Sequence, residues 1–188
     1  MITARHYSPA SRGFTLIEVL VTMVIIAIGI MGLAGLQMTS LNSQFESYQR
    51  TQALLLVEDM SNRLRANAVA ARAGGYPEGA AYGLGADVDC TTLTVTAERD
   101  LCEWNDAVAG VSVVDGARNL GSAMGARGCI ENIIGSADGE AIIRLTVAWQ
   151  GLSATVSPLS ACGVDAFGDD DSFRRTVTMD TVLANLAI

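Results

Sequence analysis

A run of 23 residues from Phe14 to Leu36 constrains this chain more than any other feature of the sequence. It reads FTLIEVLVTMVIIAIGIMGLAGL, and Glu18 is its one charged residue. As an α-helix that rises about 1.5 Å per residue, the run would be roughly 35 Å long, enough to cross the ~30 Å hydrocarbon core of a bilayer. The run therefore predicts a single membrane-spanning helix over residues 14–36.

The distribution of charge around this run predicts its orientation. Residues 1–13 carry two arginines and no acid, residues 14–73 are neutral, and residues 74–188 carry a net charge of −10. Positively charged flanks stay on the cytoplasmic side of a membrane. We therefore expect a cytoplasmic N-terminus and an acidic C-terminal domain on the other side.

Glu18 is the residue that a plain membrane anchor does not explain. A carboxylate costs about 2.5–3.5 kcal/mol at the bilayer centre and less near the interface, so a simple anchor or a secretory signal peptide would rarely keep it. If the chain were cut after Gly13, the new amine of Phe14 could approach Glu18 of a neighbouring copy and neutralise both charges. This pairing predicts an assembly element in which Glu18 sets the register between packed helices.

Residues 12–20, Arg-Gly-Phe-Thr-Leu-Ile-Glu-Val-Leu, resemble the leader of type IV prepilins and pseudopilins. In that family a basic leader ends in Gly, the first mature residue is usually Phe, and the fifth is Glu. The resemblance implies that a prepilin peptidase removes residues 1–13 by cutting between Gly13 and Phe14, that Phe14 is then N-methylated, and that Glu18 is the family's acid. It also implies an inner-membrane protein with a periplasmic head that later reaches the pilus at the cell surface.

From Gln37 the chain becomes amphipathic, and no helix breaker appears before Gly74 and Gly75. The apolar residues that recur at largely helical spacing are Leu41, Phe45, Tyr48, Leu55, Met60 and Leu64. We expect one helix from Phe14 to Ala73, with the stripe on its amphipathic half, residues 37–73, covered by the C-terminal domain. A long coiled coil is the alternative, but strict heptads are not sustained.

Further segments resemble the PilV-type minor pilins. They are residues 32–37, 58–60 and 63–67 in the long helix, and residues 100–104, 147–151 and 174–177 beyond it. The resemblance implies a minor pilin that joins other minor pilins and the major pilin at the inner-membrane assembly platform. Such a protein primes the fimbrium or caps its tip, and so serves pilus functions such as twitching motility. The alternative is a minor pseudopilin of a type II secretion system, which shares the signature from Gly13 to Glu18.

Residues 74–188 predict a small head that contains both helix and sheet. A helix is expected over residues 96–108, and alternating apolar residues predict strands at about 127–134, 141–149 and 173–183. Ser136 to Gly139 has the composition of a hairpin turn. The expected fold is therefore α+β and pilin-like: a long N-terminal helix, transmembrane in its first half, packed on a small antiparallel sheet.

The cysteines predict disulfides rather than a metal site. Cys90, Cys102, Cys129 and Cys162 show no C-x-x-C spacing, which argues against a zinc ribbon. An even number in an exported segment indicates two disulfides. Three pairings are possible, and we favour Cys90–Cys102 with Cys129–Cys162.

The remaining residues argue against an enzyme. The single histidine, His6, lies in the leader, and no Ser/His/Asp, Cys/His or phosphate-binding arrangement appears. The net charge of −8 disfavours nucleic acid. Asp165 and residues 169–171 lack the EF-hand pattern, which favours a solvated acidic loop. We expect no cofactor, metal or small-molecule substrate, and a head that binds other proteins.

Two pairs of residues in the head lead to structural expectations. Trp104 and Trp149 are expected in the hydrophobic core. Arg174 and Arg175 are neighbours in a predicted strand and therefore point to opposite faces of the sheet. One of them is expected to contact the long helix and the other to face outward.

Overall fold

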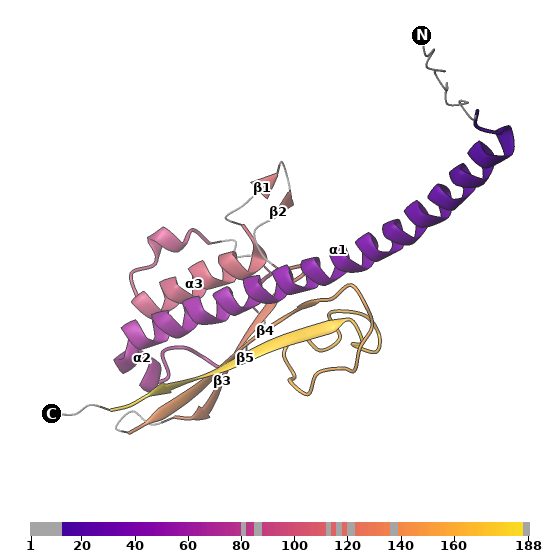
Figure 1. Cartoon of the computed structure of the whole chain (residues 1–188). Helices are drawn as coiled ribbons and strands as arrows, with labels where there is room; N and C mark the ends of the chain where they lie inside the picture. The colour runs from indigo at the N-terminus through magenta and orange to yellow at the C-terminus, as the bar shows by residue number, and fades with distance from the viewer. Residues whose placement is uncertain are drawn as a thin grey trace, which may run out of the picture. The chain divides into compact units, whose positions relative to one another are not determined.

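The computed structural model describes residues 13–79, 82–84, 88–111, 114–115, 118–119, 123–135 and 139–185 (Figure 1). The elements in chain order are α1 (Leu16–Ala66), α2 (Ala68–Arg72), the 3-10 helix η1 (Cys90–Thr92), α3 (Thr96–Ala109), β1 (Val114–Asp115), β2 (Arg118–Asn119), β3 (Arg127–Ile134), β4 (Ala141–Gln150) and β5 (Arg174–Leu183). The expected α+β, pilin-like architecture is confirmed, with a long N-terminal helix and a small antiparallel sheet. Residues 1–12, which include His6, lie outside the described residues, and so do residues 136–138 of the predicted turn.

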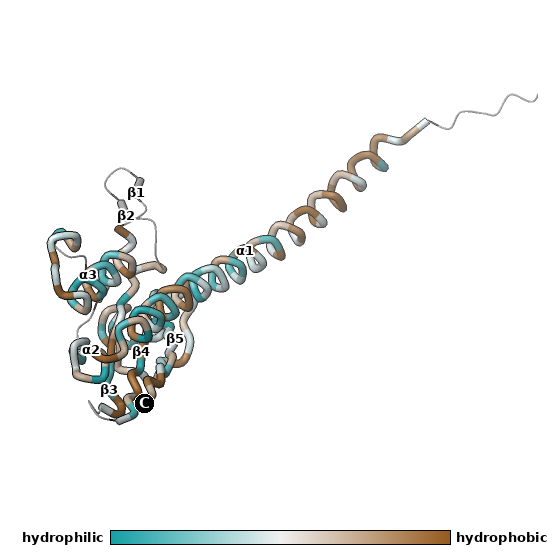
Figure 2. Tube along the Cα trace, turned by 90° about the vertical axis from the view of Figure 1, so that its left-hand side faces the viewer, coloured by the Kyte–Doolittle hydropathy of each residue, from teal (hydrophilic) through white to brown (hydrophobic). Residues whose placement is uncertain are grey.

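The chain divides into two units, which meet between Ser43 and Gln44 and are described separately. In the first unit, every described residue from Gly13 to Ser43 is exposed. Figure 2 shows that this part of α1 is mostly apolar. Of the described helices, α1 alone is long and apolar enough to cross a membrane, which agrees with the predicted spanning helix in length and composition.

In the second unit, the buried side of α1 differs from the predicted apolar stripe. The buried residues are Gln49, Ala53, Val57, Met60, Ser61 and Leu64. Met60 and Leu64 were predicted correctly, but Leu41, Tyr48 and Leu55 are more than half exposed and Phe45 is 39% exposed. At these four positions the prediction was wrong because it followed the largest apolar side chains. The helix instead turns small side chains such as Ala53 and Ser61 inward, and these allow a close approach to the sheet.

The predicted helix to Ala73 is interrupted by one residue. Asn67 adopts a non-helical conformation between α1 and α2, and its side-chain amide donates to the Tyr76 hydroxyl at 3.2 Å. The helical segment then ends at Gly74, whose φ of +80° is accessible to glycine at little cost. The helix breakers identified in the sequence therefore act where they were expected.

Strands β3, β4 and β5 form an antiparallel meander in that order. The β3–β4 register pairs Arg127 with Ala148 and shifts between Asn132 and Ile134, whereas the β4–β5 pairing is continuous from Gln150–Arg174 to Ala141–Leu183. The three predicted strands are confirmed to within one residue at each end. A separate two-residue pair, β1–β2, was not predicted.

Contacts between α1 and β5 show that the two elements run in the same direction within the second unit. Glu46 lies 3.7 Å from Arg175 in an ion pair, and the hydroxyls of Ser61 and Thr181 form a buried 2.8 Å hydrogen bond. Farther on, Arg72 donates to the carbonyl of Ala184, just beyond the end of β5. Contacts therefore progress along both elements from their N-terminal to their C-terminal ends.

Trp104 occupies the centre of the core and is fully buried. Its indole packs at 5.1 Å, centroid to centroid, from the ring of Tyr82. Gly128 makes room for it, because a Cβ at that position would lie 2.5 Å from the nearest atom of the Trp104 ring. Trp149 is also buried, so both tryptophans lie in the core as expected.

Candidate processing and assembly site

The peptide bond between Gly13 and Phe14 lies before the first turn of α1. Both residues are exposed, and Phe14 retains 83% of its accessible surface. A Cβ built on Gly13 would meet no atom within 4 Å. Both residues precede Leu16, the first residue of α1, so this peptide bond lies outside the helix.

Thr15 caps the N-terminus of α1. The backbone N–H of Glu18 donates to the Thr15 carbonyl at 3.1 Å and lies 3.3 Å from the Thr15 hydroxyl oxygen. Thr15 and Glu18 thus have the Ser/Thr-x-x-Glu spacing of a capping box, and a carboxylate in the first turn interacts favourably with the helix dipole. This capping role was not predicted, although the Thr-x-x-Glu pattern before an apolar run is its recognised signal.

Glu18 also lines a shallow hollow at the start of α1. The hollow has a volume of about 270 Å³, and its lining residues are Phe14, Glu18, Val19 and Thr22. Thr22 donates its hydroxyl to the Val19 carbonyl at 2.8 Å. Among the described residues, no donor bonds to the Glu18 carboxylate. The hollow therefore offers a charged acceptor, within an otherwise apolar helix surface, to a donor from another molecule.

The four cysteines form two disulfides in the second unit. Cys90 is bonded to Cys102, which joins η1 to α3, and Cys129 is bonded to Cys162, which joins β3 to the loop between β4 and β5. This is the pairing that the sequence analysis favoured. Asp106 brings a carboxylate oxygen within 4.8 Å of the Cys90 and Cys102 sulfurs. Disulfide sulfurs are not thiolates, so these three groups do not form a metal site as they stand.

The loop that follows β4, residues 151–173, is held to the head by Arg174. This arginine is buried, and its guanidinium donates to the carbonyls of Ser160, Cys162 and Pro158. It also pairs with the carboxylate of Asp171 at 3.2 Å. The expectation that one of the two strand arginines faces outward was therefore wrong, because the loop folds over Arg174 and its carbonyls replace water.

The prediction that the whole acidic loop is solvated was wrong at Asp171. Asp165, Asp169 and Asp170 are exposed as expected, but Asp171 is buried. Its carboxylate neutralises Arg174 and accepts a hydrogen bond from the backbone N–H of Asp165 at 3.1 Å. A buried arginine needs such a partner, because an unpaired charge in the interior costs several kcal/mol.

Arg175 makes the expected contact between the strand and the long helix. It pairs with Glu46 on α1 and donates to the Ser153 carbonyl at 2.6 Å. The other carboxylate oxygen of Glu46 accepts from the backbone N–H of Leu152 at 2.8 Å. One acid on α1 thus fixes both the start of the loop and the first residues of β5.

A second ionic cluster joins α1 to α3. Arg63 lies 2.7 Å from Glu103, 3.0 Å from Asp59 and 3.3 Å from Asp100. Burial alone would lower the pKa of Arg63, but the bonds to Glu103 and Asp59 raise it above its ordinary value. Tyr76 donates its hydroxyl to Asp100 at 2.6 Å. Burial, reinforced by this hydrogen bond, raises the pKa of Tyr76 to about 12.

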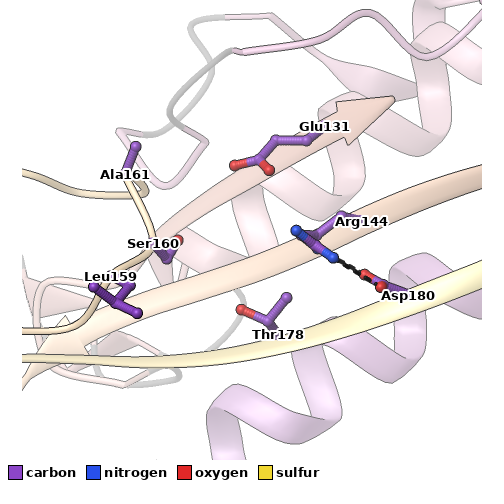
Figure 3. Close-up of a pocket in the computed structure, with 7 residues that line it drawn as sticks. All are labelled: Glu131, Arg144, Leu159, Ser160, Ala161, Thr178 and Asp180. Carbon is purple, nitrogen blue, oxygen red and sulfur yellow. Dashed lines mark hydrogen bonds and ion pairs between the residues drawn. The ribbon is translucent and has the colours of Figure 1, made fainter. Parts of the chain in front are cut away.

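A hollow with a volume of about 550 Å³ lies on the outer face of the sheet (Figure 3). It is lined by Glu131, Arg144, Leu159, Ser160, Ala161, Thr178 and Asp180. Arg144 and Asp180 form a bidentate pair, with distances of 2.8 and 2.9 Å. The hydrogen bond from Arg144 holds the pKa of Asp180 below its usual value. These lining residues include no histidine or cysteine.

Comparison with known proteins bears on the N-terminal part of the chain. Residues 8–34 match the family model described as the prokaryotic N-terminal methylation motif. No curated protein and no solved structure matches the chain significantly. The motif includes Gly13, Phe14 and Glu18, and it implies processing by a prepilin peptidase and assembly into a pilus or pseudopilus. Together with the apolar helix, which fits anchoring in a membrane, the motif supports a type IV pilin-like protein.

Proposed function

We propose that the protein is a minor pilin of a type IV pilus. It is cleaved by prepilin peptidase between Gly13 and Phe14, N-methylated at Phe14, and co-assembled with other minor pilins to prime the pilus or cap its tip. The observation that carries this proposal is the methylation motif at residues 8–34, which leads directly into an exposed apolar helix. The disulfide-bonded α+β head after the helix is consistent with an exported subunit.

The proposal assigns a role to each part of the chain. Residues 1–13 are the leader, residues 14–36 are the transmembrane and assembly half of the helix, and residues 37–73 are its amphipathic half. Residues 74–188 are the periplasmic head, which binds other subunits and performs no catalysis. The N-terminus is cytoplasmic before cleavage, in agreement with the two arginines of the leader and the net charge of −10 on the head.

Glu18 performs its role through charge neutralisation. Cleavage after Gly13 would create an amine on Phe14, four residues before Glu18. In a bundle of such helices, the amine of one subunit can enter the hollow of another and donate to the Glu18 carboxylate. Both charges are then neutralised in a medium of low dielectric constant, where the attraction between them is strong. The energetic gain depends on axial register, so Glu18 selects one offset between neighbouring helices.

Mass spectrometry of the mature N-terminus tests the processing step. The full chain, expressed together with a type IV pilus machinery, should begin with N-methylphenylalanine at position 14. Gly13→Ala should remain uncut and stay out of the fibre fraction. Gly29→Ala is the matched control, because it places the same methyl group in the same apolar segment, where nothing lies within 4 Å. Normal cleavage of Gly13→Ala would overturn the assignment of the peptidase site.

Co-purification distinguishes the pilus from a secretion pseudopilus. The mature chain should be recovered with sheared fibres that contain the major pilin and other minor pilins. Recovery with the components of a type II secretion channel, and not with fibres, would instead identify a minor pseudopilin. That result would overturn the pilus assignment while leaving the processing site intact.

A further inference from the structure

The two edges of the three-stranded sheet differ in how they are covered. Along β3, Tyr82 and Gly128 exchange two backbone hydrogen bonds of 2.8 Å, and the N–H of Gly79 donates to the Ile130 carbonyl at 2.9 Å. Along the other edge, β5 is the last strand of the sheet and extends for ten residues. No described segment pairs with its outer side, as Figure 1 shows.

The register identifies the backbone groups on this uncovered edge. The N–H of Gly151 donates to the Phe173 carbonyl at 2.8 Å, so odd-numbered residues of β5 bond to β4 and even-numbered residues point away. Arg174 agrees with this alternation, because its N–H donates to Asp171 and not to β4. The even-numbered residues that follow are Thr176, Thr178, Asp180 and Val182. Within the described part of the chain, their backbone groups make no hydrogen bond on the open side.

Strand β5 also lacks the features by which proteins protect such an edge. It contains no proline, glycine or lysine, and its pairing with β4 has no bulge. Besides the buried Arg174, β5 has two charged residues, and both already form ion pairs. Arg175 pairs with Glu46, and Asp180 pairs with Arg144. A long, regular strand edge of this kind is a template for an additional strand.

The side of α1 that borders β5 indicates the chemistry of that strand. Ser61 contacts Thr181 and so marks the face of α1 that borders β5. Helical periodicity places three further residues on this face: Arg50, Leu54 and Arg65, which are 11 and 7 positions before Ser61 and 4 positions after it. Leu54 is 39% exposed, and both arginines are exposed and form no ion pair with described residues. A strand beside β5 would therefore place its helix-facing side chains against two guanidinium groups and a leucine.

We propose that β5 accepts an extended strand from a second, different protein, and that this strand carries acidic and apolar side chains on the face that meets α1. The inference rests on the proposed co-assembly with other subunits, one of which supplies the strand. A second copy of β5 does not have the required chemistry. Its helix-facing residues include no acid and are Arg175, Val177, Met179, Thr181 and Leu183. Pairing of β5 with β3 of another copy is blocked by the backbone hydrogen bonds that Gly79 and Tyr82 already make to β3.

Hydrogen exchange tests the proposal on the full chain, first purified alone in detergent and then recovered in the assembled fibre fraction. The N–H groups of Thr176, Thr178, Asp180 and Val182 should exchange rapidly in the purified chain. On assembly their exchange should slow at least 100-fold, while the odd-numbered residues remain protected in both samples. Even-numbered amides that stay rapid after assembly would overturn the proposal. Concentration-dependent protection in the purified chain would indicate a second copy and would equally overturn it.

Two substitutions provide an independent measurement of incorporation. Thr178→Pro removes one outward N–H without removing a bond to β4 and should reduce recovery in fibres at least tenfold. Thr178→Val is the matched control: it also removes the hydroxyl contact with Thr146 but keeps the N–H, and it should assemble normally. Equal recovery of the two variants would contradict strand addition.

A double charge reversal at Arg50 and Arg65 to Glu should likewise reduce incorporation, whereas Arg99→Glu on α3 should not. Unchanged recovery of the double variant would contradict the acidic character of the partner strand. Failure of the edge proposal remains distinguishable from failure of the proposed function. In the first case the chain is still cut after Gly13 and methylated at Phe14; in the second it is not.

Discussion

The indole N–H of Trp104 donates a 2.8 Å hydrogen bond to the backbone carbonyl of Leu56. This bond joins the middle of α3 to the buried half of α1, and it is made at a point where the tryptophan is completely enclosed. The ring can lie there because Gly128 in β3 leaves the space open. Three elements therefore meet at one side chain, and the stability of the head depends on this contact.

Gly128→Ala should destabilise the head by about 1–3 kcal/mol, because the added methyl group would overlap the Trp104 ring. Urea unfolding followed by tryptophan fluorescence measures the change in the free energy of unfolding. Gly135→Ala is the control, since a Cβ at that glycine meets nothing within 4 Å. Equal stability of the two variants would argue against this packing.

Removal of each disulfide by paired Cys→Ser substitution should destabilise the head by different amounts. Cys129 and Cys162 are 33 residues apart, and Cys90 and Cys102 are 12 apart. In the chain-entropy model the longer loop contributes about 4 kcal/mol and the shorter one about 3 kcal/mol. Denaturant unfolding of the two double variants provides the comparison, and a larger loss for the Cys90/Cys102 variant would contradict the model.

Arg174→Met should cost about 3–5 kcal/mol, because it removes the donors to the loop carbonyls and leaves the buried carboxylate of Asp171 without its charged partner. The double variant Arg174→Met/Asp171→Asn should recover part of this loss. Hydrogen exchange should show faster opening confined to residues 151–173. Retained protection of this loop in the single variant would show that the disulfide alone holds it.

The buried Tyr76 should make the stability of the head depend on alkaline pH. The pKa of Tyr76 in the folded state is about 12, above the value of about 10 for an unperturbed tyrosine. Between these values the folded state retains a proton that the unfolded state has lost. The stabilisation is therefore complete below pH 10 and is lost as the pH rises through 12. The chain has no lysine to obscure this titration.

Unfolding measured from pH 8 to 12, together with tyrosinate absorbance, checks the effect. Tyr76→Phe should be less stable at pH 8, because the bond to Asp100 is lost, and its stability should fall less steeply above pH 10. A slope identical to that of the unaltered chain would assign the effect to another group, such as Tyr82, whose pKa burial also raises.

Glu18→Ala should insert into the membrane and be cleaved, but it should assemble poorly because the amine of the neighbouring subunit loses its acceptor. Thr15→Ala separates this role from capping, since it removes the cap hydroxyl and keeps the carboxylate, at a cost of about 1 kcal/mol in helix stability. The fibre fraction should contain Thr15→Ala at near-normal levels and little Glu18→Ala. Equal incorporation of both variants would refute charge pairing.

The sequence predicted the elements whose signals are local and periodic. The alternation of apolar and polar residues predicted the first and last residues of β3, β4 and β5 to within one position. The glycines after Ala73 marked the end of the helical segment. The motif from Gly13 to Glu18 was equally clear, because each position has a distinct chemical type. Thr15 could have been recognised as a cap by the same local reasoning.

Long-range features were not predictable in the same way. The buried face of α1 depends on how closely the sheet approaches, so Ala53 and Ser61 point inward while Tyr48 and Leu55 remain exposed. The burial of Arg174 depends on where a 23-residue loop folds back, which no local pattern of charges reveals. The open edge of β5 likewise follows from strand order, which the strand predictions alone did not specify.

The common direction of β5 and the buried half of α1 has a mechanical consequence. A tensile force that enters the head along α1 acts parallel to the strands, while the hydrogen bonds between β4 and β5 lie across them. Such a force must shear the ten paired positions together, because it cannot peel them apart one after another. The head is thus built to resist pulling along the direction in which its helix would transmit it.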